Sequence, residues 1–213
     1  GHVHWFGTDG GYLWNGIETV PVPTGYGEPK LNNLDWVVWW EYDGTDTEIF
    51  LYDGSNVKQL SDNEVGDYRP DINDFGHVVW VEFASPNNQI MYYNGSETIN
   101  ITENQSITDS EFPKINNNGY VTWQGRNDGD RDIFLYDGLK VLNITGKRGL
   151  SDEYPDINNH NHVVWFGDDG SHDEVFLYNG TDIIQISNRS FNCSAPEIND
   201  NGHIAWTQYD GGN

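Results

Sequence analysis

The fold is decided by the stretch PDINNHNHVVW at residues 155–165, because related versions of it recur along the whole chain. The other versions begin at Pro29, Pro70, Pro113 and Pro196, so that successive copies are 41, 43, 42 and 41 residues apart. A fixed period of this size is the signature of a repeat architecture, in which each unit packs against the next. The sequence therefore predicts repeated units of about 42 residues.

Each repeat has the pattern of four short strands. An apolar strand such as Val163–Trp165 follows the proline strand, an aromatic strand such as Phe176–Tyr178 comes next, and Asn-Gly or Asp-Gly leads into the last. These dipeptides are strong hairpin signals because tight turns require positive φ. Four antiparallel strands in a unit of this length are typical of a β-propeller blade.

We therefore predict an all-β fold, a β-propeller of five four-stranded blades built from ~42-residue repeats, with a surplus C-terminal strand. The prediction is a single domain over residues 1–213, because one period runs from end to end. The repeats begin near Gly1, Pro29, Pro70, Pro113 and Pro155, and a partial repeat begins at Pro196.

The repeat resembles that of the TolB-like propellers of bacterial and archaeal envelope proteins. The likeness lies in Pro-x-Ile-Asn, Gly-His-Val-Val-Trp, an acidic Asp-Gly loop, Ile-Phe-Leu-Tyr-Asp-Gly and Gln-Leu-Ser, and it covers nearly the whole chain. After the first strand that family usually has Ser-Pro-Asp-Gly, where this sequence has Asn-Asp/Asn-x-Gly. The resemblance implies an extracytoplasmic binding or scaffolding propeller, usually without catalysis in the propeller itself.

The surplus strand is a sixth copy of the second strand of the repeat, since the other three strands occur five times each. Residues 196–199 could complete the blade that the N-terminal segment begins, which would leave residues 203–206 over. Strand exchange between subunits would use such a strand, and head-to-tail exchange that does not close gives a filament. A closed monomer, or a fragment of a longer propeller, is the alternative. The predicted assembly residues are His2, Val3, Trp5, His203, Ile204 and Trp206.

The charge and the cysteine count restrict the partners and the compartment. Thirty-four acidic residues against ten basic ones give a net charge of -24, which excludes nucleic acid as a partner. No apolar run is long enough for a membrane span, and Cys193 has no second cysteine to pair with in the chain. Such an acidic excess fits a solubilising surface, a halophilic habitat or cation binding.

Seven Asn-x-Ser/Thr sequons predict a glycosylated protein that is extracellular or on the cell surface. They lie at Asn94, Asn100, Asn104, Asn143, Asn179, Asn188 and Asn192.

One acidic loop has carboxylates at alternate positions, as a hard cation with oxygen ligands prefers. This loop predicts a calcium site at Asp128, Asp130 and Asp132, with solvated acidic turns as the alternative. Looser versions of the pattern lie at Asp43, Asp46 and Glu48 and at Asp168, Asp169 and Asp173.

The sequence predicts no enzyme, because it has no Ser-His-Asp order, phosphate-binding glycine loop or Cys/His metal spacing. Four histidines share one repeat position, but Trp36 and Tyr120 occupy it in other copies, which favours a structural role. The asparagine of Pro-x-Ile/Leu-Asn is present in all five copies, so we predict that it hydrogen-bonds to the backbone of the following turn.

These features favour a non-enzymatic propeller with a structural or adhesive role, whose partner is a second copy of the chain in a head-to-tail homopolymer. One alternative is a lectin-like propeller, in which aromatic rings at blade edges stack on glycans. Another is an envelope propeller that binds a surface protein.

Overall fold

The computed structural model describes residues 3–7, 10–14, 17–22, 29–103, 105–127, 129–146, 150–188 and 192–209. Within these ranges the regular elements are twenty-one β-strands, and all of their pairings are antiparallel. The chain divides into two compact units, Gly1–Ile101 and Thr102–Asn213. The prediction of an all-β fold made of four-stranded repeats is confirmed, while the single domain stays a prediction.

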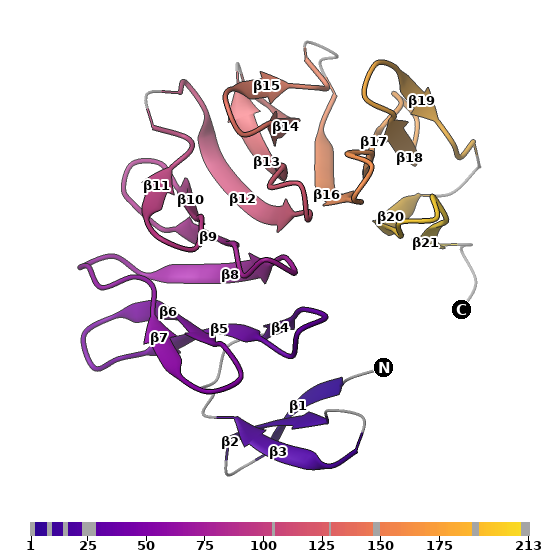
Figure 1. The fold of residues 1–213 in the computed structure, drawn as a ribbon. Helices are drawn as coiled ribbons and strands as arrows, with labels where there is room; N and C mark the ends of the chain where they lie inside the picture. The colour runs from indigo at the N-terminus through magenta and orange to yellow at the C-terminus, as the bar shows by residue number, and fades with distance from the viewer. Residues whose placement is uncertain are drawn as a thin grey trace. The chain divides into compact units, whose positions relative to one another are not determined.

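The first unit contains three sheets, which follow one another in chain order (Figure 1). A three-stranded sheet consists of β1 (Val3–Gly7), β2 (Gly10–Trp14) and β3 (Thr19–Val22). The next sheet consists of β4 (Lys30–Leu31), β5 (Val37–Tyr42), β6 (Thr47–Tyr52) and β7 (Val57–Gln59). The third consists of β8 (Asp67–Ile72), β9 (Val78–Glu82), β10 (Gln89–Tyr93) and β11 (Thr98–Asn100).

The second unit has the same organisation (Figure 1). Its first sheet consists of β12 (Thr108–Ile115), β13 (Val121–Asn127), β14 (Asp130–Tyr136) and β15 (Val141–Asn143). Its second consists of β16 (Asp152–Ile157), β17 (Val163–Asp168), β18 (Asp173–Tyr178) and β19 (Ile183–Gln185). A two-stranded sheet of β20 (Cys193–Ile198) and β21 (Ile204–Gln208) follows.

The sheets at the two ends of the described chain differ from the four complete ones. The first sheet has three strands, and the last has only the first two strands of the repeat. Residues 196–198 belong to β20, which pairs with β21, and completion of the N-terminal blade by this segment stays a prediction. The C-terminal copy of the second strand therefore has a partner on one side, and its other side is the edge of the sheet.

The hairpins between the third and fourth strands form as the Asn-Gly and Asp-Gly pairs predict. Gly54 has a φ of 90°, and the Asp53 side chain accepts hydrogen bonds from the backbone N–H groups of Ser55 and Asn56 (2.9 and 2.7 Å). This geometry is accessible to glycine without the steric cost that a Cβ imposes. The same turn occurs at Asn94, Asp137 and Asn179.

A register shift interrupts the first strand of the repeat just before its proline. Tyr154, which precedes Pro155, has a φ of 52°, and the pairing of β16 with β17 shifts between Glu153 and Asp156. A β-bulge is a place where proline removes no ladder hydrogen bond, which explains how proline is accommodated inside these strands. The other residues with positive φ before a repeat proline are Arg69, Phe112 and Ala195.

The core lies between successive sheets of each unit. Val163, Val164 and Trp165 of β17 are fully buried, and Trp165 packs in a cluster with Ile133 and Leu135 of the preceding sheet. The first unit has the corresponding cluster around Trp80. Each sheet thus buries its apolar side chains against its neighbour, as expected for repeats that have no core of their own.

The repeated asparagine connects these sheets through hydrogen bonds. Oδ1 of Asn158 accepts from the backbone N–H groups of His160 and His162 (both 3.0 Å), which confirms the predicted contact with the turn. Its Nδ2 donates to the backbone oxygen of Asn199, the equivalent residue in the next repeat (3.2 Å). The pairs Asn32–Asn73 and Asn116–Asn158 make the same contact, at 2.9 Å each.

Candidate functional site

An acidic cluster lies at the β5–β6 loop of the first unit. Asp43 and Asp46 belong to this loop, and Glu48 follows them in β6. One carboxylate oxygen from each residue lies within 4.8 Å of the others. Asp43 is exposed, Asp46 is half-buried, and the Glu48 side chain is fully buried. The cluster could hold a metal ion with three oxygen ligands.

The buried part of this cluster has carboxylate oxygens without a donor. Oε1 of Glu48 accepts a hydrogen bond from the backbone N–H of Asn63 (2.9 Å). Oε2 of Glu48 and both carboxylate oxygens of Asp46 are buried and have no hydrogen-bond partner among the described residues. Burial of a carboxylate is costly unless a donor or a cation compensates it.

Two further acids extend the cluster into the next sheet. Asp67 of β8 is buried and accepts hydrogen bonds from Nε1 of Trp80 (2.9 Å) and Nδ2 of Asn63 (3.3 Å). The same Asn63 amide donates to Glu82 of β9 (3.3 Å). Burial, reinforced by the charges of Glu82 and Glu48, raises the pKa of Asp67 to about 8. Ionisation of all of these carboxylates at neutral pH is therefore unfavourable.

The pKa values of the other two buried acids are shifted in the same direction. Burial is the largest cause that raises the pKa of Glu48, and the nearby Asp46 carboxyl raises it further. Burial raises the pKa of Glu82 as well, and the charge of Glu48 adds to this effect.

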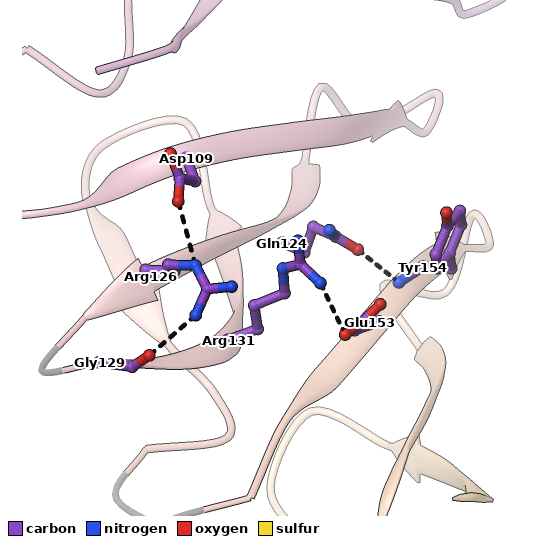
Figure 2. A network of polar contacts seen from close by, with 7 residues as sticks. All are labelled: Asp109, Gln124, Arg126, Gly129, Arg131, Glu153 and Tyr154. Atoms are coloured by element: carbon purple, nitrogen blue, oxygen red, sulfur yellow. Dashed lines mark hydrogen bonds and ion pairs between the residues drawn. The ribbon is translucent and has the colours of Figure 1, made fainter. Parts of the chain in front are cut away.

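A second polar network, in the second unit, contains arginines (Figure 2). The Arg131 guanidinium pairs with Glu153 of β16 at 2.8 Å, and Nε of Arg126 pairs with Asp109 at 3.0 Å. Oε1 of Gln124 accepts a hydrogen bond from the backbone N–H of Tyr154 (2.9 Å), the residue with positive φ before Pro155. The contacts of Arg131 and Gln124 connect the β12–β15 sheet to β16, whereas the ion pair of Arg126 lies within that sheet.

The calcium site predicted at residues 128–132 is only partly covered by the structure. Asp128 lies outside the described residues, and Asp130 is exposed at the start of β14. Asp132 is buried and accepts hydrogen bonds from Nδ2 of Asn143 (2.7 Å) and Oγ1 of Thr145 (3.2 Å). The Asp132 carboxylate thus hydrogen-bonds to the end of β15 and to Thr145 just after it. Calcium at this loop stays a prediction.

The carboxylates of the β17–β18 loop accept hydrogen bonds from backbone N–H groups of the same turn. Asp168 accepts a hydrogen bond from the Gly170 N–H (2.6 Å), and Asp169 accepts from the N–H groups of Ser171 and His172 (2.9 and 3.1 Å). Burial and the charge of Asp168 raise the pKa of Asp173.

The described sequons lie at turns and strand ends. The Asn94 and Asn179 side chains accept backbone N–H groups inside hairpin turns, whereas Asn188 and Asn192 are exposed. Nδ2 of Asn100 donates to Gln89, and Asn143 is exposed with its Nδ2 bonded to Asp132. Asn104 lies outside the described residues. Glycosylation of any of them stays a prediction.

A cavity of about 390 Å³ lies among the first strands of the second unit. The Phe112 and Tyr154 rings, whose centroids are 4.2 Å apart, contribute to its wall. The polar side chains on the wall are those of Lys114, Asp156 and Glu197. A cavity with aromatic walls and a few charged groups has the composition of a small-ligand site.

The predicted assembly residues lie in two edge strands. Val3 and Trp5 lie in β1, whose partner is β2, while His2 lies outside the described residues. His203 is exposed just before β21, and Ile204 of β21 is half-buried. Trp206 of β21 has 38% of its surface exposed, whereas Trp165, at the same position of a complete sheet, has 0%. Among the described residues β21 pairs with β20 alone, whereas β17 lies between two strands.

Among the histidines at the shared repeat position, His77 has a structural contact. Nδ1 of His77 lies 2.9 Å from the Tyr92 hydroxyl, and burial lowers the pKa of His77.

The sequence predicted the Asp43–Asp46–Glu48 pattern but not the contribution of the next sheet. Asp67 lies three residues before Pro70, and Asp152 occupies the same position before Pro155. The recurrence of this acid in the sequence could have predicted its role. Like Asp67 with Trp80, Asp152 accepts a hydrogen bond from the tryptophan of its own repeat, Trp165 (2.7 Å).

Comparisons with solved structures give the same fold. The β-propeller domain of the Trilobed protease from Pyrococcus furiosus matches with a TM-score of 0.64 and 15% identity over 84% of this chain. TolB from Acinetobacter baumannii matches with a TM-score of 0.62 and 16% identity over 90% of this chain. The acylaminoacyl peptidase of Pyrococcus horikoshii matches with a TM-score of 0.63 and 19% identity over 84%.

These neighbours establish the fold. The chain has a TolB-like β-propeller fold, and it spans 61%, 52% and 31% of the lengths of those three chains. No protein family and no curated protein matches the sequence. The part of the chain that the structure describes contains no helix with the length and apolarity needed to cross a membrane.

Proposed function

We propose that this chain is a non-enzymatic propeller, extracellular or on the cell surface, with a structural or adhesive role, and that its copies associate through β21. The observation that carries the proposal is the exposure of Trp206 on a strand with one unpaired side. An exposed apolar edge strand is a template for pairing with another chain.

A second copy is the partner that fits this edge best. β1 carries the sequence His-Val-His-Trp, β21 is part of His-Ile-Ala-Trp, and each is an edge strand of its own sheet. Antiparallel addition of β1 from a second copy would continue the ladder as β20-β21-β1-β2-β3. Because this contact is head-to-tail, repetition that does not close would produce a filament.

Sedimentation and electron microscopy of the chain, with and without a charge in β21, test the assembly. Trp206→Lys should shift the distribution to monomers, because a lysine on an edge strand opposes further pairing. Ile183→Lys is the matched control, since Ile183 lies in the outermost strand β19 of a complete sheet and is also 38% exposed. Monomers at high concentration in the unsubstituted chain, or equal effects of the two substitutions, would refute the assembly.

The proposed location rests on the seven sequons and on the net charge of -24. Mass spectrometry of the native protein before and after treatment with a glycosidase tests it. A surface glycoprotein should lose mass, with sites among the seven asparagines. An unmodified chain recovered from inside the cell would contradict this part of the proposal.

The absence of catalysis is part of the proposal as well. It is supported by the lack of a nucleophile motif in the sequence, while the solved neighbours include both TolB and peptidases. Calcium is the cation that we propose for the loop at residues 128–132, because its side-chain donors are carboxylate oxygens.

A carbohydrate-binding role is the second candidate, and the cavity beside Phe112 and Tyr154 favours it. Aromatic faces beside charged hydrogen-bonding groups suit a sugar ring. A glycan array in calcium and in chelator tests this role. Tyr154→Ala should abolish binding while Tyr209→Ala, which changes an exposed tyrosine outside the cavity, should not. No glycan bound in either condition would remove this candidate.

A further inference from the structure

We propose that Asp43, Asp46 and Glu48 form a calcium site between the β5–β6 loop and the start of β6. The inference rests on the geometry of the first unit and does not depend on the assembly through β21. It places the ion at a different loop from the one that alternate carboxylates indicated at residues 128–132.

The distances between the donors suit a single calcium ion. Calcium–oxygen distances are about 2.4 Å, so two oxygens on one ion are at most about 4.8 Å apart. The three carboxylates meet this limit, since one oxygen from each lies within 4.8 Å of the others. All three donors are hard oxygens, which favours calcium over softer metals. Calcium tolerates irregular geometry, and exposed Asp43 leaves room for water to complete the coordination.

A second and independent observation is the lack of donors for the buried oxygens. Glu48 is fully buried and its Oε2 has no hydrogen-bond partner among the described residues, and the same holds for both oxygens of Asp46. Neither residue has an ion pair in the described part of the chain. Buried carboxylate oxygens that lack a donor are costly, and a bound cation would compensate this cost.

The corresponding carboxylates of the second unit accept hydrogen bonds from neighbouring side chains. Glu174, which is equivalent to Glu48, accepts a hydrogen bond from the Ser187 hydroxyl. Asp132, at the same repeat position, accepts from Asn143 and Thr145. Ser61 occupies the position of Ser187 and also contacts Glu48. What distinguishes the first unit is Asp46, both of whose carboxylate oxygens are buried without a hydrogen-bond partner among the described residues.

The loops before these residues differ in a way that matches the inference. The β5–β6 loop reads Asp43-Gly44-Thr45-Asp46, and the β17–β18 loop reads Asp169-Gly170-Ser171-His172. In both loops the first aspartate accepts hydrogen bonds from the N–H groups two and three residues later. Histidine replaces the second aspartate in the β17–β18 loop, which removes one carboxylate. The two loops thus form a natural pair of site and control.

Calorimetric titration of the calcium-stripped full chain with CaCl₂, together with its thermal unfolding, tests the site. The unsubstituted chain should bind calcium and gain thermal stability with it. Asp46→Asn and Glu48→Gln should each weaken binding at least about tenfold, because each removes a ligand charge. Asp169→Asn, in the control loop, should leave the affinity unchanged.

Two further variants keep the inference falsifiable. Asp43 is exposed, so Asp43→Asn should fold normally even if Glu48→Gln does not, and it should weaken calcium binding about tenfold. Asp130→Asn should leave this binding unchanged, which separates the site from the loop at residues 128–132. Absence of calcium binding, or binding that survives both Asp43→Asn and Asp46→Asn, would overturn the inference.

Discussion

Two polar networks occupy corresponding positions in their repeats and balance their charge differently. In the first unit, Asp46 and Glu48 lie beside the buried Asp67 and have no arginine or lysine partner among the described residues. In the second unit, Arg131 lies next to buried Asp132 and pairs with Glu153 (Figure 2). The same strand pattern therefore tolerates either an excess of carboxylates or an arginine.

The comparison shows that the repeat constrains shape more strongly than charge. The asparagine contact between adjacent sheets and the hairpin turns are the same in both units. The polar groups around the start of the third strand instead differ from repeat to repeat. A difference in the response to pH, to salt and to calcium is thus expected between the two networks.

The largest effect should be a loss of stability of the first unit as pH rises in calcium-free buffer. The pKa of Asp67 is about 8 in the folded chain against 3.8 for an unburied aspartate, so the folded state binds more protons between these values. The unfolding free energy must then fall as pH rises from about 4 to about 8. One pKa unit corresponds to about 1.4 kcal/mol, so the total loss is several kcal/mol.

Urea unfolding followed by tryptophan fluorescence at a series of pH values measures this slope. Asp67→Asn should flatten it, because an asparagine still accepts the Trp80 hydrogen bond but does not ionise. Asp137→Asn is the control. Backbone N–H groups of Lys140 and Leu139 lower the pKa of Asp137, so this residue favours the folded state as pH rises. A slope that persists in Asp67→Asn would show that another group is responsible.

The next effect concerns the partly buried ion pair of the second unit. Arg131→Met should destabilise the chain by about 1–2 kcal/mol, because Glu153 would lose a charge-assisted hydrogen bond and the introduced methionine preserves only the apolar stem. Urea unfolding measures the loss. A double-mutant cycle with Glu153→Gln isolates the pair, and a coupling free energy near zero would mean that the pair contributes nothing.

A smaller effect of opposite sign is expected in the acidic network. In calcium-free buffer at pH 8, Asp46→Asn should stabilise the chain by about 1 kcal/mol, since it removes a carboxylate that faces Glu48 without a donor. In saturating calcium the unsubstituted chain should instead be more stable than Asp46→Asn. Thermal unfolding in chelator and in calcium measures both parts, and a substitution that destabilises the chain in chelator would contradict the proposed repulsion.

The sequence predicted the features that depend on local geometry. The four strands, the hairpin at Asp53-Gly54 and the turn contact of Asn158 follow from short-range patterns, and all three are confirmed. The acidic cluster was predicted only in part. Asp43, Asp46 and Glu48 lie within one loop and strand, whereas Asp67 reaches the cluster through the packing of a different sheet.

Other features depended on strand pairing that the sequence does not specify. Asp128, Asp130 and Asp132 were predicted to be three ligands of one ion, and this stays a prediction. The hydrogen bonds of Asp132 with Asn143 and Thr145 depend on the neighbouring strand, which the spacing of the three acids does not specify. The exposure of Trp206 depends on which strands cover β21. The strand order shows that β21 pairs with β20 alone among the described residues.

The smallest expected effect belongs to the most exposed member of the arginine network. The Arg126 and Asp109 side chains are 37% and 55% exposed, so solvent screens their 3.0 Å contact. Arg126→Gln should therefore cost at most about 0.5 kcal/mol in urea unfolding, and the loss should shrink further in about 0.5 M salt, where the Debye length is about 4 Å. Arg126 also donates to the backbone oxygen of Gly129 (2.9 Å), a contact that glutamine is too short to reproduce fully. A loss above about 1 kcal/mol that salt does not reduce would show that this contact, rather than the ion pair, stabilises the loop.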